Sequence, residues 1–169
     1  MQSVDKKLYL RGKGNTIFFD LENETGVQWV LSAEADCSGN IQTLLNWENP
    51  PMDVTSNCYI MMFRDCTNLT TAPELPTTTL AKGCYNNMFS GCTSLTTAPE
   101  LPATTLVESC YYMMFYLCTK LKVNTTNGNI IFTCPSTIPK YAVDDMFTFT
   151  TDGTFRDTPT AGNTYYYTE

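Results

Sequence analysis

Residues 58–83 read CYIMMFRDCTNLTTAPELPTTTLAKG, and residues 84–109 read CYNNMFSGCTSLTTAPELPATTLVES. A third copy begins at 110–123 with CYYMMFYLCTKLKV. The period is 26 residues without slippage, which relates three sets of equivalent positions: Cys58/Cys84/Cys110, Phe63/Phe89/Phe115 and Cys66/Cys92/Cys118. Because a segment this short cannot enclose a core of its own, consecutive copies are expected to stack on one another as a solenoid.

The first half of each copy has apolar residues four positions apart. The second copy has two such rows on one side, Leu80/Cys84/Met88 and Ala81/Tyr85/Phe89. This spacing predicts a short amphipathic helix over roughly residues 79–90, with equivalents in the other copies. The following Leu-Thr-Thr-Ala-Pro-Glu-Leu-Pro run contains two prolines, which exclude a helix and favour a short parallel strand around 95–98.

A strand and a helix that alternate every 26 residues match the plan of leucine-rich repeats, whose period is about 20–29 residues. The tract 50–122 resembles, specifically, the BspA-type leucine-rich repeats of surface proteins from Bacteroides-like gut bacteria. The matching blocks are Met-Phe-x-x-Cys-Thr-x-Leu at 88–95, Ala-Pro-Glu-Leu-Pro at 98–102 and Thr-Thr-Leu-x-x-x-Cys-Tyr at 104–111. The resemblance implies an α/β solenoid and the role of a cell-surface adhesion protein that binds other proteins.

We expect one domain over residues 1–169, in three parts. Residues 1–46 are expected to form a β-rich N-terminal cap, from apolar or alternating segments at 7–10, 16–19 and 27–31. Residues 47–122 hold the repeats. Residues 123–169 are expected to form an irregular last coil, with about six extra residues near 124–131, and a β-rich C-terminal cap. Such caps cover the apolar faces of terminal coils.

The cysteines are expected to be buried thiols rather than disulfides. Six of the eight fall in two rows of three, and an odd row cannot pair completely within itself. Equivalent side chains also point the same way instead of toward each other. Cys37 and Cys134 lie outside the period and are the candidates for an exception. A metal site is not expected, because the chain has no histidine and no Cys-x-x-Cys.

Seven residues are candidates for ligand binding. Glu48, Glu74 and Glu100 recur at the repeat period and predict an acidic row at one edge; a solvated edge without function, or a cation such as calcium, are the alternatives. The pairs Thr70-Thr71 and Thr96-Thr97 predict a neutral strip of hydroxyls on the open face. Tyr59, Tyr85 and Tyr111 either form an exposed aromatic strip, with Tyr112 and Tyr116 nearby, or pack against the core with their hydroxyls at its rim.

Composition excludes several classes of function. Without histidine, Ser-His-Asp and Cys-His catalysis are impossible, so we expect no enzyme and no cofactor. The net charge of −7 and the lack of a basic stripe argue against nucleic acid and anionic membranes as partners. No apolar run is long enough for a membrane span, and no secretion signal is visible. Either the protein is cytoplasmic, or its leader and any membrane anchor lie outside this chain.

Three functions remain in competition. The first is a non-enzymatic, secreted or cell-surface protein that binds a protein ligand. The second is a glycan-binding module, which the tyrosines and the hydroxyl strip favour. The third is a hydrolase that uses carboxylates alone, since glycoside hydrolysis needs only two. We expect an extracellular or outer-surface location from the resemblance.

Overall fold

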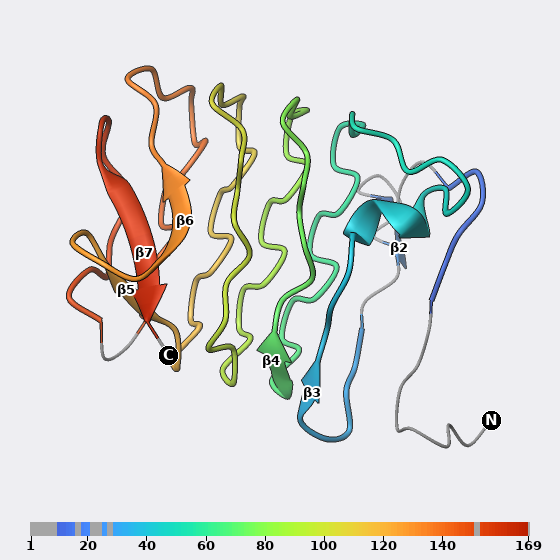
Figure 1. Ribbon diagram of the computed structural model, residues 1–169, viewed down its shortest axis with the longest axis horizontal. Helices are drawn as coiled ribbons and strands as arrows, with labels where there is room; N and C mark the ends of the chain where they lie inside the picture. The colour runs from blue at the N-terminus through green and yellow to red at the C-terminus, as the bar shows by residue number, and fades with distance from the viewer. Residues whose placement is uncertain (1–9, 16–17, 21–24, 27–28, 151–152, 169) are drawn as a thin grey trace.

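The computed structural model describes residues 10–15, 18–20, 25–26, 29–150 and 153–168. Within these residues the only helix is the 3₁₀ helix η1 (Ile41–Leu44). The strands are short and belong to three small sheets. They are β1 (Phe19–Asp20), β2 (Thr25–Gly26), β3 (Ala35–Asp36), β4 (Leu69–Thr71), β5 (Lys122–Asn124), β6 (Asn129–Thr133) and β7 (Thr164–Thr168). Most of the described chain runs as irregular backbone in coils that lie side by side (Figure 1).

The expected α/β solenoid of leucine-rich repeats is therefore wrong. Residues 79–90 contain no α-helix, and neither do the equivalent segments of the other repeats. They form a succession of tight turns. The strand expected at 95–98 is also missing: β4 of the first repeat has as its counterpart only an isolated parallel bridge, between Thr71 and Thr97.

Hydrogen bonding in the turn segments alternates between two kinds of partner. Even-numbered residues donate their N–H groups to the carbonyl three residues back, as Met88 does to Tyr85 at 3.2 Å. Odd-numbered residues donate to the next repeat, as Tyr85 does to the Cys110 carbonyl at 3.1 Å. An α-helix would use every interior N–H within its own segment. Here half of these donors join one repeat to the next, which explains why the segments cannot be isolated helices.

The alternation requires a left-handed residue at every fourth position. In the second repeat these residues are Gly83, Asn87 and Gly91, with φ of 64°, 54° and 77°. Glycine and asparagine adopt this conformation more readily than other residues. The four-residue spacing of Leu80, Cys84 and Met88 therefore reflects the length of one turn and not the pitch of a helix.

Aromatic rings form two continuous rows through the core. One row stacks Phe18, Tyr59, Tyr85 and Tyr111, with centroids 5.6–6.1 Å apart. The other stacks Trp29, Phe63, Phe89, Phe115 and Phe147, with centroids 5.5–6.4 Å apart. Each offset-stacked pair adds about 0.5–1.5 kcal/mol to the burial of the rings. The 26-residue period thus relates side chains that are in direct contact.

All eight cysteines are free thiols, which confirms the expectation for the six cysteines of the two rows. Cys37 and Cys134, the candidates for an exception, are free as well. Seven are buried and Cys37 is half-buried. The Cys92 thiol donates to the Phe63 carbonyl at 3.0 Å, and the Cys118 thiol donates to the Phe89 carbonyl at 3.1 Å. Each of these bonds links one repeat to its predecessor. Burial raises the pKa of Cys58 and of Cys110 to about 11.

The two ends of the stack are covered differently. At the C-terminal end, β5, β7 and β6 form an antiparallel sheet in that order, with Tyr165–Tyr167 inside β7 (Figure 1). In the first two repeats a donor and its acceptor in the next coil are 25 residues apart, as Asn57 and Lys82 are. Between the third repeat and the last coil they are 31 residues apart, as Ser109 and Lys140 are. At the N-terminal end, β1 pairs with β2 and β3 pairs in parallel with β4. Of the strands expected at 7–10, 16–19 and 27–31, residues 7–9, 16–17 and 27–28 lie outside the described residues. Phe19 belongs to β1, whereas residues 29–31 are not in a strand.

Candidate functional site

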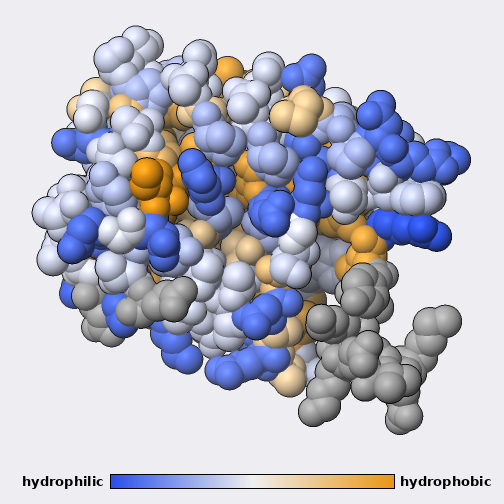
Figure 2. All heavy atoms as spheres, viewed as in Figure 1, coloured by the Kyte–Doolittle hydropathy of each residue, from blue (hydrophilic) through white to orange (hydrophobic). Residues whose placement is uncertain are grey.

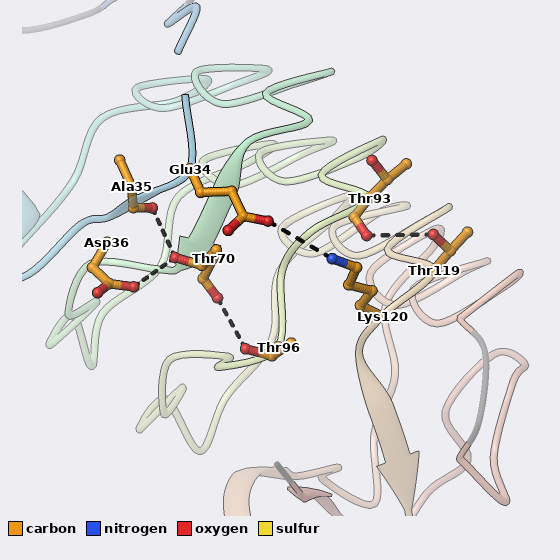
Figure 3. A network of polar contacts seen from close by, with 8 residues as sticks. All are labelled: Glu34, Ala35, Asp36, Thr70, Thr93, Thr96, Thr119 and Lys120. Atoms are coloured by element: carbon orange, nitrogen blue, oxygen red, sulfur yellow. Dashed lines mark hydrogen bonds and ion pairs between the residues drawn. The ribbon is translucent and has the colours of Figure 1, made fainter. Parts of the chain in front are cut away.

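The threonine pairs singled out in the sequence lie along the line where β3 and β4 meet the next repeat. Figure 3 shows one residue of each pair, Thr70 and Thr96. The Thr70 hydroxyl has two acceptors within hydrogen-bonding distance. They are the Ala35 carbonyl at 2.9 Å and Asp36 Oδ1 at 2.5 Å. The Thr71 hydroxyl donates to the same Asp36 oxygen at 2.7 Å, and the Thr96 hydroxyl donates to the Thr70 carbonyl at 3.3 Å. These three hydroxyls therefore connect neighbouring coils and do not form a free strip. Thr97 is half-buried, and its carbonyl accepts from Ala72 N at 3.1 Å.

The same face carries a long-range ion pair. Lys120 Nζ lies 3.9 Å from Glu34 Oε1, so a side chain of the third repeat reaches the segment just before β3 (Figure 3). Both side chains are largely exposed, and such pairs contribute about 0–1 kcal/mol. Nearby, the Thr70 hydroxyl and then the Thr71 hydroxyl lower the pKa of Asp36 by hydrogen bonding to its carboxylate. Polar groups on this face are engaged with one another.

The three glutamates do not act as one row. Glu48 forms an ion pair with Lys13, with Nζ and Oε2 3.1 Å apart. Glu74 and Glu100 are exposed and both line a shallow groove between the first and second repeats. The structure thus brings together two of the three predicted glutamates.

The groove has a volume of about 380 Å³, close to the lower end for small-ligand sites. Its lining comes from two copies of the same motif: all of Ala72–Pro76, and Ala98, Pro99, Glu100 and Pro102 of the second copy. One end of the groove adjoins the hydrogen bond from Ala72 N to the Thr97 carbonyl. Beyond it come prolines, which have no N–H to continue a ladder between the two segments. The groove therefore has apolar walls and carries the carboxylates of Glu74 and Glu100 on its rim.

Tyr59, Tyr85 and Tyr111, which form the first aromatic row, are buried, with 0–1% of their surface exposed. The exposed aromatic strip is therefore wrong for them, and their hydroxyls lie deeper than a rim. Tyr85 donates its hydroxyl to Thr77 Oγ1 at 3.1 Å, and Thr77 also accepts from the buried Gln42 amide. Tyr59 donates to the Ile41 carbonyl at 3.5 Å. These tyrosines stabilise the core.

Exposed and half-buried aromatic side chains gather instead at the boundary of the third repeat and the last coil. We call Tyr112, Tyr116, Leu117, Tyr141 and Phe149 the aromatic patch. Tyr141 is 48% exposed and Phe149 is 57% exposed. Tyr112 contacts Tyr141 edge to face, with centroids 6.1 Å apart, and Tyr116 contacts Phe149 in the same way at 5.4 Å. The sequence pattern points only to Tyr112 and Tyr116, because Tyr141 and Phe149 belong to a coil that is out of register.

The aromatic patch also contains unfavourable backbone. Leu117, Tyr141 and Phe149 have φ of 60°, 56° and 62°, in the left-handed region. A bulky residue there is an outlier that costs about 1–2 kcal/mol. In the second repeat the positions equivalent to Leu117 and Ser109 are Gly91 and Gly83. The patch therefore combines exposed apolar surface with local strain.

We expect Leu117→Gly to stabilise the protein by about 0.5–1 kcal/mol, because relief of the left-handed strain exceeds the added flexibility of the unfolded chain. Urea unfolding monitored by circular dichroism measures this change. Leu117→Ala is the matched control, since it removes the same exposed side chain but keeps a Cβ in the left-handed conformation. Equal stabilisation by the alanine variant would contradict a strain effect.

No group of three or more His, Cys, Asp and Glu residues in the part of the chain that the structure describes is arranged to hold a metal ion. In the same part, no helix has the length and apolar character to cross a membrane. Figure 2 shows a face dominated by hydrophilic residues, with apolar residues visible between them. The groove and the aromatic patch are thus the two candidate binding surfaces.

Comparisons of the chain with protein-family models, with curated proteins and with solved structures gave no match.

Proposed function

We propose that this protein is a non-enzymatic binding protein, secreted or displayed on the cell surface, which binds an extended segment of a protein ligand in the groove between its first two repeats. The resemblance of residues 50–122 to BspA-type surface proteins supports the location and the adhesive role. The observation that carries the proposal is the groove itself, with its apolar walls and the rim carboxylates of Glu74 and Glu100.

The shape and charge of the groove favour a cationic, extended peptide. Each of the two lining segments carries one glutamate, Glu74 or Glu100, at the same repeat position. Two basic side chains of a ligand can therefore form ion pairs with the two carboxylates. The chain as a whole has a net charge of −7, which assists the approach of a basic partner. The half-buried Pro76 and Pro102, one from each lining segment, present apolar surface for aliphatic side chains between the basic ones.

The carboxylate hydrolase is the weaker alternative. Glycoside hydrolysis uses two carboxyl groups across an enclosed bond, with one held protonated by its surroundings. Glu74 and Glu100 are exposed on the rim of a shallow groove. Such a site binds a ligand without excluding water from it.

Selection from a displayed peptide library is expected to enrich extended peptides with two basic residues. We expect the double variant Glu74→Gln/Glu100→Gln to bind the selected peptides at least about tenfold more weakly, because both rim charges are lost. Fluorescence anisotropy at two salt concentrations measures the loss and its electrostatic origin. Neither substitution touches the buried core.

Glu48→Gln is the matched control, because Glu48 holds the equivalent repeat position but lies outside the groove lining. Its affinity is expected to equal that of the unaltered protein. Enrichment of acidic or neutral peptides, or equal binding by the double variant, would rule out the groove as a site for basic segments.

The glycan alternative is favoured by a separate observation, the aromatic patch, which lies on the third repeat and the last coil and not beside the groove.

A further inference from the structure

We infer that the aromatic patch is a second binding site, which takes one or two units of a neutral glycan. This site does not depend on the proposed peptide groove. The inference begins with the coincidence of two penalties at one place. Tyr141 and Phe149 are the two most exposed aromatic residues of the last coil, and both occupy left-handed backbone positions. Either penalty alone would be removed by a small polar residue.

The other repeats show that such residues fit. The position of Phe149 is held by Asp65 in the first repeat and by Gly91 in the second, and the position of Tyr141 is held by Asn57 and Gly83. These residues tolerate the left-handed conformation and expose no ring. Bulky aromatics are therefore not needed to form the turn. Strained residues that the fold does not require are candidates for function.

The rings are held in a fixed arrangement. Tyr112 and Tyr141 meet at an interplanar angle of 64°, and Tyr116 and Phe149 meet at 77°. The backbone beneath them is fixed by hydrogen bonds between coils, from Met113 N to the Asp144 carbonyl at 3.0 Å and from Leu117 N to the Thr148 carbonyl at 3.1 Å. A preorganised surface of this kind loses little conformational entropy when a ligand binds.

The size of the patch distinguishes a sugar from a protein partner. A stable protein interface needs roughly 800 Å² from each partner, contributed by about 20–30 residues. The aromatic patch has five side chains, and its neighbours include the polar Asp144, Asp145 and Thr148. Aromatic rings offer apolar faces to the C–H side of a sugar, while tyrosine hydroxyls and nearby carboxylates bind its hydroxyl groups. This combination fits a saccharide.

The charges around the patch favour a neutral sugar over an acidic one. Lys140 Nζ lies over the Tyr141 ring, 4.7 Å from its centroid. The segment from Lys140 to Phe149 also holds Asp144 and Asp145, so its net charge is −1. This charge favours a neutral sugar over a uronic or sialic acid.

The test uses the whole chain and a panel of neutral tetra- to hexasaccharides built from glucose, mannose, galactose or xylose, with an oligogalacturonate as the acidic comparison. Isothermal titration calorimetry is expected to detect binding of at least one neutral member and none of the acidic one. In Tyr112→Asn/Tyr116→Ser the two residues are those of the second repeat, Asn86 and Ser90, so the backbone accommodates them. We expect the affinity to fall at least about tenfold.

Phe149→Asp gives a second variant that is expected to fold, since Asp65 occupies the equivalent left-handed position. It should weaken glycan binding to a similar extent. Trp47→Ser is the control, because Trp47 is an exposed aromatic residue outside the patch, with Arg11 over its ring. Its binding should be unchanged. The inference is overturned if no panel member binds at millimolar concentration, or if the patch variants bind as well as the Trp47 variant.

Discussion

Raising the pH from 9 to 10 is expected to lower the free energy of unfolding of this protein by about 5 kcal/mol. Burial holds five thiols of the two cysteine rows in their protonated form. The pKa of Cys58 and of Cys110 rises to about 11, and the pKa of Cys84, of Cys92 and of Cys118 rises further. In the unfolded chain these thiols ionise near their ordinary pKa of 9.0. Above that pH the unfolded state therefore binds fewer protons than the folded state, and stability falls as the pH rises.

The size of this effect follows from the number of thiols. Each contributes up to about 1.4 kcal/mol per pH unit once it is ionised in the unfolded chain and protonated in the folded one. The five thiols together amount to about 5 kcal/mol between pH 9 and 10, against a total stability of roughly 5–15 kcal/mol for a typical domain. The contribution of Cys58 and Cys110 is complete below pH 9 and is lost as the pH rises through about 11.

Urea midpoints measured at several pH values in the presence of a reducing agent test this expectation. The slope of stability against pH gives the number of protons released on unfolding. Cys84→Ala should reduce that number by one, at the expense of a small cavity. A free energy of unfolding that stays constant from pH 8 to pH 10 would contradict the claim that the buried cysteine thiols stay protonated in the folded protein.

Phe89→Ala is expected to destabilise the protein by about 3–5 kcal/mol. Phe89 is fully buried and stacks on both Phe63 and Phe115, at 5.5 and 5.7 Å, with interplanar angles of 11° and 7°. The substitution removes the middle ring of a continuous row, so it leaves a cavity and ends two stacking contacts at once. For a chain of 169 residues this corresponds to a decrease in Tm of roughly 6–20 °C.

Differential scanning calorimetry measures that decrease. Ile130→Ala is the control, because Ile130 is a large apolar residue that is 49% exposed on β6. Its replacement should change the stability by less than about 1 kcal/mol. A loss of comparable size in both variants would mean that the ring row does not carry the stability ascribed to it.

The sequence determines which residues are neighbours better than it determines their backbone. The 26-residue period relates Tyr59 to Tyr85 and Phe63 to Phe89, and these rings are in contact. The odd number of cysteines in each ladder correctly indicated free thiols. Both conclusions depend only on the repeat and on side-chain chemistry, and neither depends on the local conformation.

The backbone prediction failed because two structures share a spacing of four. A helical face mixes spacings of three and four residues, since a turn has 3.6. The row Leu80, Cys84, Met88 and Cys92 has only fours. Together with Gly83, Asn87 and Gly91, which suit left-handed positions at the same interval, this pattern could have indicated a series of four-residue turns. The signal was weak because Met113 and Leu117 occupy such positions in the third repeat.

The candidate sites were predicted only in part. Glu74 and Glu100 were found through the repeat, but the ion pair of Glu48 with Lys13 depends on the N-terminal segment, which does not repeat. The hydroxyls of Thr70, Thr71 and Thr96 form hydrogen bonds with the Asp36 carboxylate, the Ala35 carbonyl and the Thr70 carbonyl. No periodic pattern in the sequence reveals these partners. Tyr141 and Phe149 lie after the inserted residues, so the period does not relate them to Tyr112 and Tyr116.

The alternation of hydrogen bonds has a consequence for how such a chain can change in length. Every second N–H of a turn segment serves the next coil, and each coil offers the same row of carbonyls to its predecessor. Duplication or loss of one whole copy, through recombination between the nearly identical gene segments, leaves all donors and acceptors matched. Residues added outside the turn segments, as before the last coil, keep this match, whereas a shift within a turn segment places rings against turns and donors against donors. The stack can therefore gain or lose a coil only together with its complete turn segment.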